Sequence, residues 1–243
     1  MKYLLFLLIT LLAEILGTVG GFGSSIFMVS LSQFFFNFKT ILAITGLMHV
    51  FSNGSKMWLF RQHINWKISL LLGIPGVILV LIGAWLTTYI RLTWAEAALG
   101  IVLIVTSTAL WLKPNWKLAP TKTNAIVGGG LAGFLAGFIG TGGPLRGLLL
   151  AGFNFEKGVF IATSATIDMG VDLSRSFIYL GNNYLGTDLY FLIPFLVVVS
   201  FVGSWVGKQL LDKISQALFK KIILGLVFAI GISLLLKFYF EVT

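Results

Sequence analysis

The sequence predicts an all-α integral membrane protein built from two inverted repeats, each a re-entrant or broken glycine-rich helix pair followed by three transmembrane helices. Three observations favour this class. The 243-residue chain is 58% hydrophobic and only 10% charged, whereas a soluble domain usually carries about 25% charged residues. Charge-free windows such as 68–90 and 125–145 are long enough to span a bilayer, which takes about 20 residues. Two similar glycine-rich breaks interrupt the apolar runs, at residues 17–25 and 137–146.

The second break reads Gly-Phe-Ile-Gly-Thr-Gly-Gly-Pro-Leu-Arg. It cannot be ordinary helix, because glycine costs about 1 kcal/mol and proline about 3 kcal/mol in a helix interior. Backbone that leaves helical geometry at membrane depth must be buried in protein or line a cavity. A broken apolar segment that occurs twice is typical of membrane transporters.

The first half, residues 1–112, is the first repeat. Its expected apolar helical segments cover 3–16, 24–36, 40–60, 66–90 and 93–112, of which the first two form one broken unit. Residues 113–123 form a polar linker, expected on the cytoplasmic side, in which Pro114 and Pro120 stop the helix. The second repeat, 124–243, has the broken unit 124–153 and helices at 157–180, 187–211 and 215–240. We expect Pro75 and Pro194 to lie inside helices and to kink them.

An internal duplication explains this layout, because residues 137–180 loosely repeat 17–60. The matching features are Asn37-Phe38-Lys39 with Asn154-Phe155-Glu156, Pro75 with Pro194, and Ile82-Gly83-Ala84-Trp85 with Val202-Gly203-Ser204-Trp205. Their common order and similar spacing predict two copies of one unit.

Charge counting favours re-entrant geometry for the broken units. Of the 17 cations, all but Lys56, Arg146 and Arg175 lie near the ends of apolar segments. If each broken unit crosses the membrane once, those cations divide evenly between the two sides. If each unit enters and leaves on one side, the division is uneven, a clear positive-inside signal. The richer side then holds Arg61, Lys67, Lys113, Lys117, Lys122, Lys157, Lys208, Lys213, Lys220 and Lys221, and the poorer side Lys2, Lys39, Arg91 and Lys237. We therefore expect three full crossings per repeat, with both termini outside.

The net charge of +9 does not indicate a nucleic-acid partner, because the lysines lie mostly in short loops where they set membrane orientation. The expected partners are the lipid bilayer and a small-molecule anion. The chain has no cysteine and only two histidines, His49 and His63, which excludes a thiolate metal site, a redox motif and the histidine-rich iron enzymes of membranes. We expect no cofactor, no metal and no enzymatic activity.

Each break brings the start of a new helix towards the middle of the protein, where its free N–H groups and partial positive charge favour an anion. The helix restarts at Ser24 and Ser25 in the first half and at Pro144, a favoured first-turn residue, in the second. Arg146 follows this second break. The alternative is that the glycines only pack helices together, as small residues do in membranes.

The helix after each break carries a polar stripe with the spacing i, i+4, i+7, which places its members on one helix face. The stripes are His49, Asn53 and Lys56 in the first half and Asp168, Asp172 and Arg175 in the second. Charged groups inside a membrane are costly and usually mark function. A structural ion-pair network, with Asp172 paired to Arg175, is the alternative, and both can hold together.

The embedded charges balance when His49 is neutral. The cations are Lys56, Arg146 and Arg175, and the candidate anions are Glu14, Asp168 and Asp172. A substrate anion that enters a neutral cavity is an unpaired charge, which is costly in low dielectric. A proton on His49, Asp168 or Asp172 restores the balance, so we expect proton coupling. Glu14 is one turn before the first break, and its side chain could face either the site or the outer interface.

The motifs Gly20-Gly21-Phe22-Gly23 and Gly140-Thr141-Gly142-Gly143-Pro144, with the duplicated layout, resemble the sulfite exporter TauE/SafE family of membrane transporters. The resemblance implies transport of sulfite, sulfoacetate or a related organosulfonate across the bacterial inner membrane by a multi-pass protein. It also implies binding-site positions at Gly20, Gly23, Gly140, Gly142 and Gly143. The first motif departs from the family's usual glycine run followed by a proline, since Ser24, Ser25 and Ser30 occupy that region, and this leaves the exact anion open.

The sequence therefore favours a secondary transporter for a small sulfur-containing anion. The expected substrate contacts are the helix ends at the two breaks, including Ser24 and Ser25, with charge supplied by Lys56, Arg146 and Arg175. An intramembrane enzyme of the lipid-diphosphate phosphatase type and an anion channel are the alternatives. The oligomeric state is not predicted.

Overall fold

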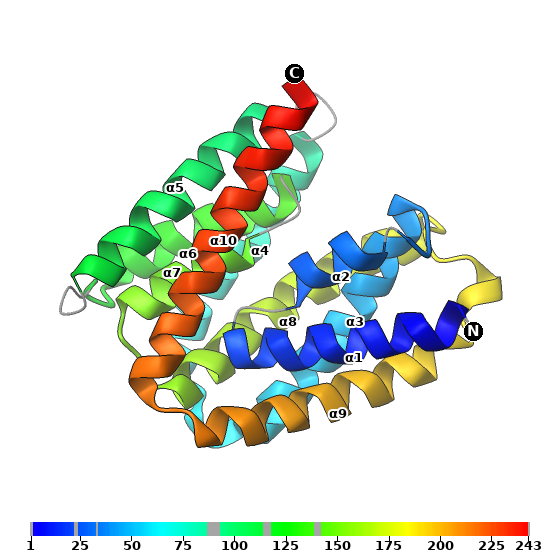
Figure 1. Cartoon of the computed structure of the whole chain (residues 1–243), viewed down its shortest axis with the longest axis horizontal. Coiled ribbons are helices and arrows are strands. Elements are labelled where there is room, and N and C mark those ends of the chain that lie inside the picture. The colour runs from blue at the N-terminus through cyan, green and yellow to red at the C-terminus, as the bar shows by residue number, and fades with distance from the viewer. Residues whose placement is uncertain are drawn as a thin grey trace.

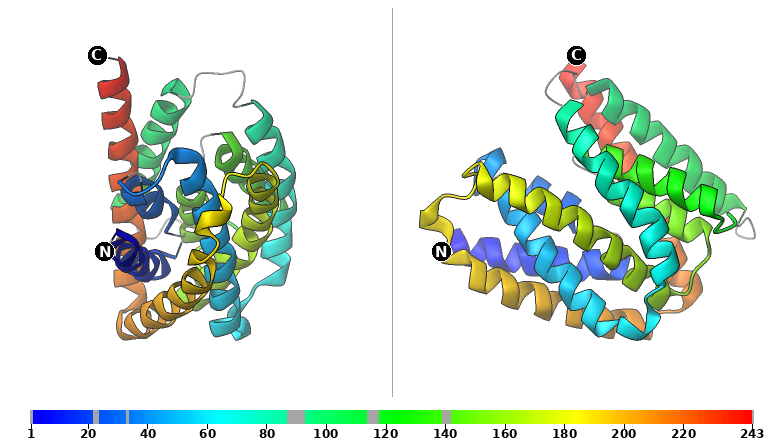
Figure 2. Two further views of the ribbon diagram at one scale, coloured as in Figure 1. Left: turned by 90° about the vertical axis from the view of Figure 1, so that its right-hand side faces the viewer. Right: turned by 180° about the vertical axis from the view of Figure 1, so that it is seen from behind.

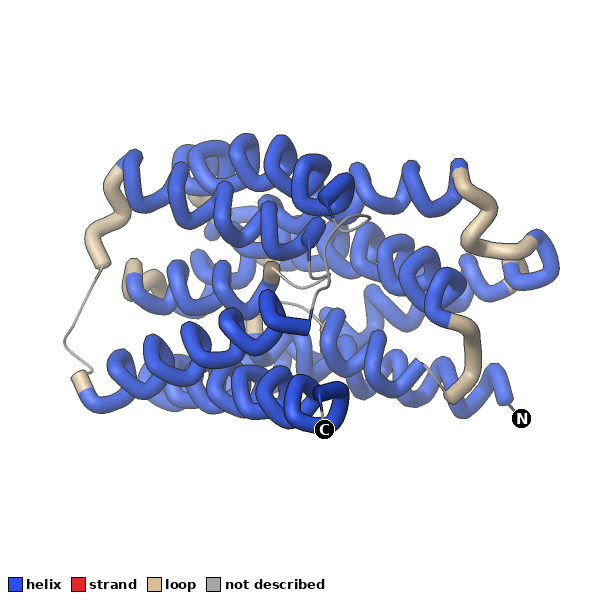
Figure 3. Tube along the Cα trace, turned by 90° about the horizontal axis from the view of Figure 1, so that it is seen from above, coloured by secondary structure: helices blue, strands red, loops and turns tan. Residues whose placement is uncertain are grey.

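A computed structural model of the chain describes residues 2–21, 24–32, 34–86, 93–113, 118–138 and 142–242. Every regular element within these ranges is helical, which confirms the predicted all-α class (Figure 3). The helices of the first half are α1 (Lys2–Gly20), α2 (Ser25–Ser32), α3 (Phe38–Leu59), α4 (Trp66–Leu86) and α5 (Thr93–Leu112). Those of the second half are α6 (Lys122–Phe138), α7 (Gly143–Gly152), α8 (Lys157–Gly181), α9 (Leu192–Lys213) and α10 (Gln216–Val242). Two 3-10 turns, Arg61–His63 and Thr187–Leu189, precede α4 and α9.

Each broken unit folds as a helix hairpin with one long arm and one short arm. The short arms α2 and α7 have 8 and 10 residues, about 12 and 15 Å of helix, whereas the hydrocarbon core of a bilayer is about 30 Å thick. Each packs against the helix before it, and Figure 1 shows α2 turning back alongside α1. The short arms therefore cannot cross a membrane by themselves.

The first arm is longer than the sequence suggested, because α1 continues beyond the expected 3–16 segment to Gly20. Gly17 therefore lies inside α1. A glycine is needed at this position because the returning chain passes close to it. A Cβ atom at Gly17 would lie 2.6 Å from the backbone nitrogen of Ser24. The reversal itself begins at Gly21, whose φ of 75° is in the left-handed region that favours glycine.

Two further boundaries differ from those expected. Pro194 was expected to kink a helix over 187–211, but α9 begins at Leu192, so Pro194 lies in its first turn, where the missing N–H has no intrahelical acceptor. The linker is shorter than 113–123, because the Thr121 hydroxyl accepts from the Asn124 N–H and α6 begins at Lys122. The segment expected over 66–90 is helical from Trp66 to Leu86, and its expected end lies outside the described residues. Pro75 lies inside α4, as predicted.

The helix pairs with the most contacts keep the same pattern when the two halves are exchanged. Helix α3 packs on α8, and α5 packs on α10, and the colours in Figures 1 and 2 show that the members of each pair run in opposite directions. Helix α4 packs on α6, just as α9 packs on α1. Helices at corresponding places in the order of the two halves therefore meet each other or exchange partners.

Glycines allow the closest of these contacts. In the α4–α6 pair, a Cβ atom on Gly133 would lie 2.1 Å from the carbonyl oxygen of Gly76. In the α1–α9 pair, Cβ atoms on Gly203 and Gly207 would lie 2.7 Å from Glu14 and 2.6 Å from Thr18. The interpretation of glycines as packing residues thus holds for these helix faces.

Most of the buried apolar side chains among the described residues form two clusters. One gathers α5, α7, α10 and the start of α8, and includes Leu103, Leu150, Phe160 and Val227. The other joins α1, α2, α3 and α9, and includes Phe6 and Met48. Helices α5 and α10 both contact α7, and Figure 1 shows them together on that side of the molecule.

Within the described residues, four helical segments are long and apolar enough to cross a membrane. They are Lys2–Gly20, Trp66–Gly83, Leu192–Lys213 and Gln216–Phe240. Large apolar side chains are exposed along them, among them Leu12, Ile74, Val198 and Leu236, as expected where a helix faces lipid. Helices α3 and α8, which carry the polar stripes, lie between these apolar helices and pack on each other.

Candidate functional site

A small polar cavity lies where the starts of α2 and α7 meet the middle of α3 and α8. Its lining consists of Ser25, His49, Ala136, Gly142, Gly143, Arg146, Asp168, Val171, Asp172 and Arg175. Ser25 is the first residue of α2, and Gly142 directly precedes α7. The cavity has a volume of about 30 Å³, which is room for about two water molecules. Both helix starts and both polar stripes therefore reach one place.

Most residues predicted for the site line this cavity, and a few do not. Ser24 lies behind the lining, hydrogen-bonded to His49. Gly20 is buried at the end of α1 but is not part of the lining. Lys56 is also absent from the lining, for a reason given below. Gly23 and Gly140 lie outside the described residues.

Arg146 lies in the first turn of α7 with only 4% of its surface exposed. Its Nη2 forms a close ion pair with Oδ2 of Asp168, and its Nε donates to Oγ of Ser164 at 3.2 Å. Both partners belong to α8, so the guanidinium is held on two sides. A planar guanidinium fixed in this way can offer its remaining N–H groups to an oxyanion.

Arg175 forms the second arginine–aspartate pair at the cavity, with 2.5 Å between its Nη2 and Oδ1 of Asp172. Asp172 also accepts a hydrogen bond of 2.7 Å from Nδ2 of Asn53 on α3. Nε of Arg175 is buried and has no hydrogen-bond partner among the described residues. A buried donor without an acceptor costs about 1–3 kcal/mol, so this N–H favours an acceptor in the cavity.

His49 lies between these charges and the first break, and it is 5% exposed. Its Nδ1 is 3.3 Å from Oγ of Ser25, 3.4 Å from Nη2 of Arg175 and 3.6 Å from Oδ2 of Asp172. Its Nε2 is 3.1 Å from Oγ of Ser24. One ring nitrogen thus faces the cavity and the other faces Ser24.

The hydrogen bonds of the Ser24 hydroxyl determine the tautomer of His49. Its single proton is donated to Oε2 of Glu14 at 2.9 Å, so Oγ of Ser24 accepts from Nε2–H of His49. A neutral imidazole carries one N–H, which leaves Nδ1 unprotonated and able to accept from Ser25 or Arg175. Nδ1 is therefore the atom at which His49 can take up a proton from the cavity.

The model of the sulfite exporter TauE/SafE family matches residues 6–234. The chain belongs to the TauE/SafE family. The resemblance seen in the two glycine-rich motifs is thereby confirmed. No curated protein and no solved structure matches the chain. TauE/SafE proteins are membrane transporters of sulfur-containing anions.

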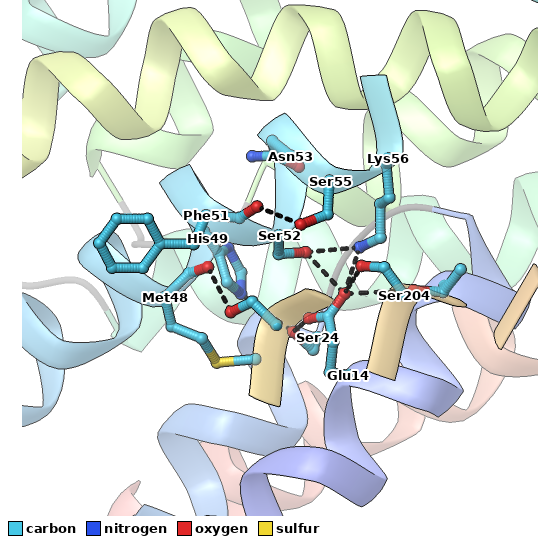
Figure 4. A network of polar contacts seen from close by, with 12 residues as sticks. Glu14, Ser24, Met48, His49, Phe51, Ser52, Asn53, Ser55, Lys56 and Ser204 are labelled. Carbon is cyan, nitrogen blue, oxygen red and sulfur yellow. Dashed lines mark hydrogen bonds and ion pairs between the residues drawn. The ribbon is translucent and has the colours of Figure 1, made fainter. Parts of the chain in front are cut away.

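This TauE/SafE chain buries a second polar cluster around Glu14, shown in Figure 4. Glu14 is fully buried. Its Oε1 lies 2.8 Å from Nζ of Lys56 and accepts from three hydroxyl groups, and its Oε2 accepts from Ser24. The hydroxyl donors to Oε1 are Ser52 at 2.6 Å, Ser204 at 3.0 Å and Thr18 at 3.1 Å. The carboxylate joins α1, α3 and α9 at one point.

Two sequence expectations concern residues of this cluster. Glu14 faces the interior of the protein and not the outer interface. Lys56 was expected to supply charge to the substrate site, but its ammonium is held by Glu14 and by the hydroxyl of Ser52 at 2.8 Å. Lys56 turns away because α1 offers a carboxylate on that side of α3. The serines at 52 and 204 could have been noticed as small polar residues inside apolar helices.

The TauE/SafE breaks serve packing and cavity lining together. Gly142 lines the cavity, and a Cβ atom on it would lie 2.1 Å from the carbonyl oxygen of Ala132 in α6. The two interpretations of these glycines are therefore compatible. Among the residues that the structure describes, no group of three His, Asp or Glu side chains could hold a metal ion.

Proposed function

We propose that this TauE/SafE protein is a secondary transporter that moves a small sulfur-containing anion, such as sulfite, sulfoacetate or a related organosulfonate, across the bacterial inner membrane. The observation that carries the proposal is the cavity where Arg146 and Arg175 meet the starts of α2 and α7. Ser25, Gly142 and Gly143 present the helix starts to it. Helix starts and guanidinium groups are the two protein features that best bind oxyanions.

The expected anion contacts follow from the free donors. Nε of Arg175 is buried without a partner among the described residues, and the first N–H groups of α7 have no intrahelical acceptor. Pro144 provides no N–H, so Gly143 and Leu145 supply the free donors of that turn. Sulfonate and sulfite oxygens accept such charge-assisted hydrogen bonds.

Charge balance supports coupling to protons. Arg146, Arg175 and Lys56 are each paired with a buried carboxylate. The site is thus neutral while His49 is neutral, and an incoming anion adds an unbalanced charge in a low-dielectric interior. A proton taken up at Nδ1 of His49 cancels one unit of that charge and converts Nδ1 into a donor towards the anion or Asp172.

The small cavity and the arrangement of the helices support transport by alternating access. A volume of about 30 Å³ holds about two waters, which is too little for a sulfur atom with its oxygens. The site must therefore widen to admit substrate. Helix pairs α3–α8 and α5–α10 run in opposite directions (Figure 1), which favours two inverted halves that rock about the cavity.

The proposal is tested by measuring anion binding to the purified protein by calorimetry, with sulfite, sulfoacetate, sulfate, taurine and phosphate. We expect sulfite or sulfoacetate to bind, and Arg175→Ala to weaken binding about 10- to 100-fold, since a charge-assisted hydrogen bond contributes about 1.5–3 kcal/mol. Arg175→Lys should recover only part of the affinity, because an ammonium lacks the planar fork.

Arg61→Ala is the matched control, because Arg61 is an exposed cation in the turn after α3. It should bind as the wild type does. Binding that is unaffected by Arg175→Ala and Arg146→Ala would remove the cavity as the substrate site. Wild-type protein that binds neither sulfite nor sulfoacetate would refute the proposed substrate class.

A further inference from the structure

The Glu14–Lys56 pair lies outside the cavity but is connected to it. Neither residue is part of the cavity lining. Ser24 bridges the two places, since its Oγ is 2.9 Å from Oε2 of Glu14 and 3.1 Å from Nε2 of His49. An unbroken chain of hydrogen bonds therefore runs from Nδ1 of His49 at the cavity to the buried Glu14 carboxylate.

The pair is displaced towards one end of the molecule. Lys56 is seven residues after His49 on α3, which is about 10 Å along a helix. It lies in the last turn of α3. Beyond that end, a surface hollow is lined by His63 and by the charged residues Glu156, Lys157, Lys208 and Asp212, on the side where the sequence places most loop cations. The Glu14–Lys56 pair thus lies between the cavity and the cation-rich face.

The second half has no equivalent of this pair. Arg175 occupies the stripe position of Lys56, but the residue 120 positions after Glu14 is Phe134. Arg175 pairs with Asp172 of its own helix. A carboxylate that served only to join helices would be expected in both copies, so its presence on one side indicates a directional role.

Lys56 and four hydroxyl donors hold Glu14 as a carboxylate, the form that can accept a proton. The charged and titratable groups that face it are Lys56 directly and His49 through Ser24, both on α3. Helix α9 contributes only the hydroxyl of Ser204, and α1 contributes that of Thr18. Hydroxyl groups can rotate to follow a change in the proton on Oε2, and Lys56 keeps the carboxylate in place.

We propose that Glu14 is a second coupling site, which receives through the Ser24 hydroxyl the proton that His49 takes up when the anion binds. This inference rests on the proposed transport function. In the transfer, a proton binds to Nδ1 of His49, the proton on Nε2 passes to Oγ of Ser24, and the original Ser24 proton passes to Oε2 of Glu14. The histidine ends neutral, the serine is chemically unchanged, and Glu14 ends protonated.

The test uses the full protein in liposomes and radiolabelled sulfoacetate, whose sulfonate does not titrate in the working range of pH. Two quantities are measured: exchange of sulfoacetate without a gradient, and its accumulation driven by a pH gradient. We expect Glu14→Gln to keep exchange within about threefold of the wild type but to lose gradient-driven accumulation by at least about tenfold. Ser24→Ala should behave likewise. Ser24→Thr keeps the hydroxyl and should therefore retain gradient-driven accumulation.

Ser204→Ala is the matched control, because it removes one hydrogen bond to Glu14 without interrupting the chain to His49. It should keep accumulation. If Glu14→Gln leaves Lys56 unpaired and fails to fold, Glu14→Gln with Lys56→Gln removes both charges and takes its place.

Each result bears on the inference. Wild-type accumulation in Glu14→Gln, or equal damage from Ser204→Ala and Ser24→Ala, would overturn it. Loss of exchange in both Glu14 variants would assign Glu14 to the substrate path and would also overturn it. Failure of the wild type itself to exchange sulfoacetate or sulfite would refute the proposed function instead, and this inference with it.

Discussion

Asn53 on α3 and Asp172 on α8 are joined by a hydrogen bond of 2.7 Å from Nδ2 to Oδ2. They occupy the middle positions of the two polar stripes, and both are buried, at 5% and 2% exposure. The bond therefore links the two halves of the protein directly beside the cavity, and it holds the carboxylate that pairs with Arg175.

Asn53→Leu should destabilise the protein, because Asp172 then loses a donor in a buried position. The expected cost is about 1–3 kcal/mol of unfolding free energy, seen as a lower midpoint of thermal unfolding in detergent. Asn182→Ala at the exposed end of α8 is the control, and a surface change of this kind should alter stability by less than about 0.5 kcal/mol. Equal midpoints for Asn53→Leu and wild type would show that the link contributes no stability.

Asp168→Asn should bind anions more tightly than the wild type. The substitution leaves the Arg146 charge uncompensated at the cavity, while the amide oxygen can still accept from the guanidinium. We expect about tenfold higher affinity for sulfoacetate by calorimetry at neutral pH, equivalent to about 1.4 kcal/mol. Asp212→Asn, an exposed carboxylate near the end of α9, should leave affinity unchanged. Weaker binding by Asp168→Asn would mean that Asp168 orients Arg146 more than it neutralises it.

Anion binding should strengthen as the pH falls. Binding strengthens in this direction because acidification favours the protonated form of His49, and this form adds positive charge to the site. One linked proton allows at most about a tenfold rise in affinity per pH unit. His49→Gln should remove most of this dependence. A full pH slope in His49→Gln would place the proton on Asp168 or Asp172.

Gly133→Ala should separate α4 from α6. A Cβ atom there would lie 2.1 Å from the carbonyl oxygen of Gly76, so the backbones must move apart, and overpacking of this kind costs about 1–3 kcal/mol or more. The measurement is the thermal unfolding midpoint in detergent. Gly181→Ala is the control, because a Cβ atom there meets nothing within 4 Å. Similar midpoints for the two variants would contradict close α4–α6 packing as a source of stability.

Single cysteines can test the orientation, since the chain has no cysteine of its own. Gln62 and Asn182 are both exposed, after α3 and after α8 respectively. If the cation-rich side is cytoplasmic, Asn182→Cys in intact cells should react with a membrane-impermeant maleimide, whereas Gln62→Cys should react only after the membrane is opened. The reverse pattern would invert the topology.

Helical periodicity in the sequence accounts for most of the correct predictions about the candidate site. The spacing i, i+4, i+7 predicted that His49 and Asn53 share one face of α3, and that Asp172 and Arg175 share one face of α8. Both faces meet at the cavity. The glycine and proline residues predicted where helices restart, and several of the residues predicted there also line the cavity. A helix that starts near the middle of the protein has few other places to point.

What the sequence could not predict depends on contacts between distant segments. Lys56 shares the stripe with His49, but its long side chain can reach either neighbour, and Glu14 on α1 decides the direction. The hydroxyl of Ser204 reaches Glu14 from 190 positions away, which no local pattern encodes. Pro194 was misplaced because a proline inside a helix and a proline in its first turn look alike in a sequence.

The stripes have diverged so far that the two copies cannot replace each other. A tandem of two first halves would contain His49 and Glu14 twice, but it would have no arginine at the start of its second short helix. A tandem of two second halves would have arginines and aspartates on both sides, but no imidazole and no Ser24. Under the proposed function, the recognition of the solute falls mainly to the second half of the chain and the handling of the proton mainly to the first.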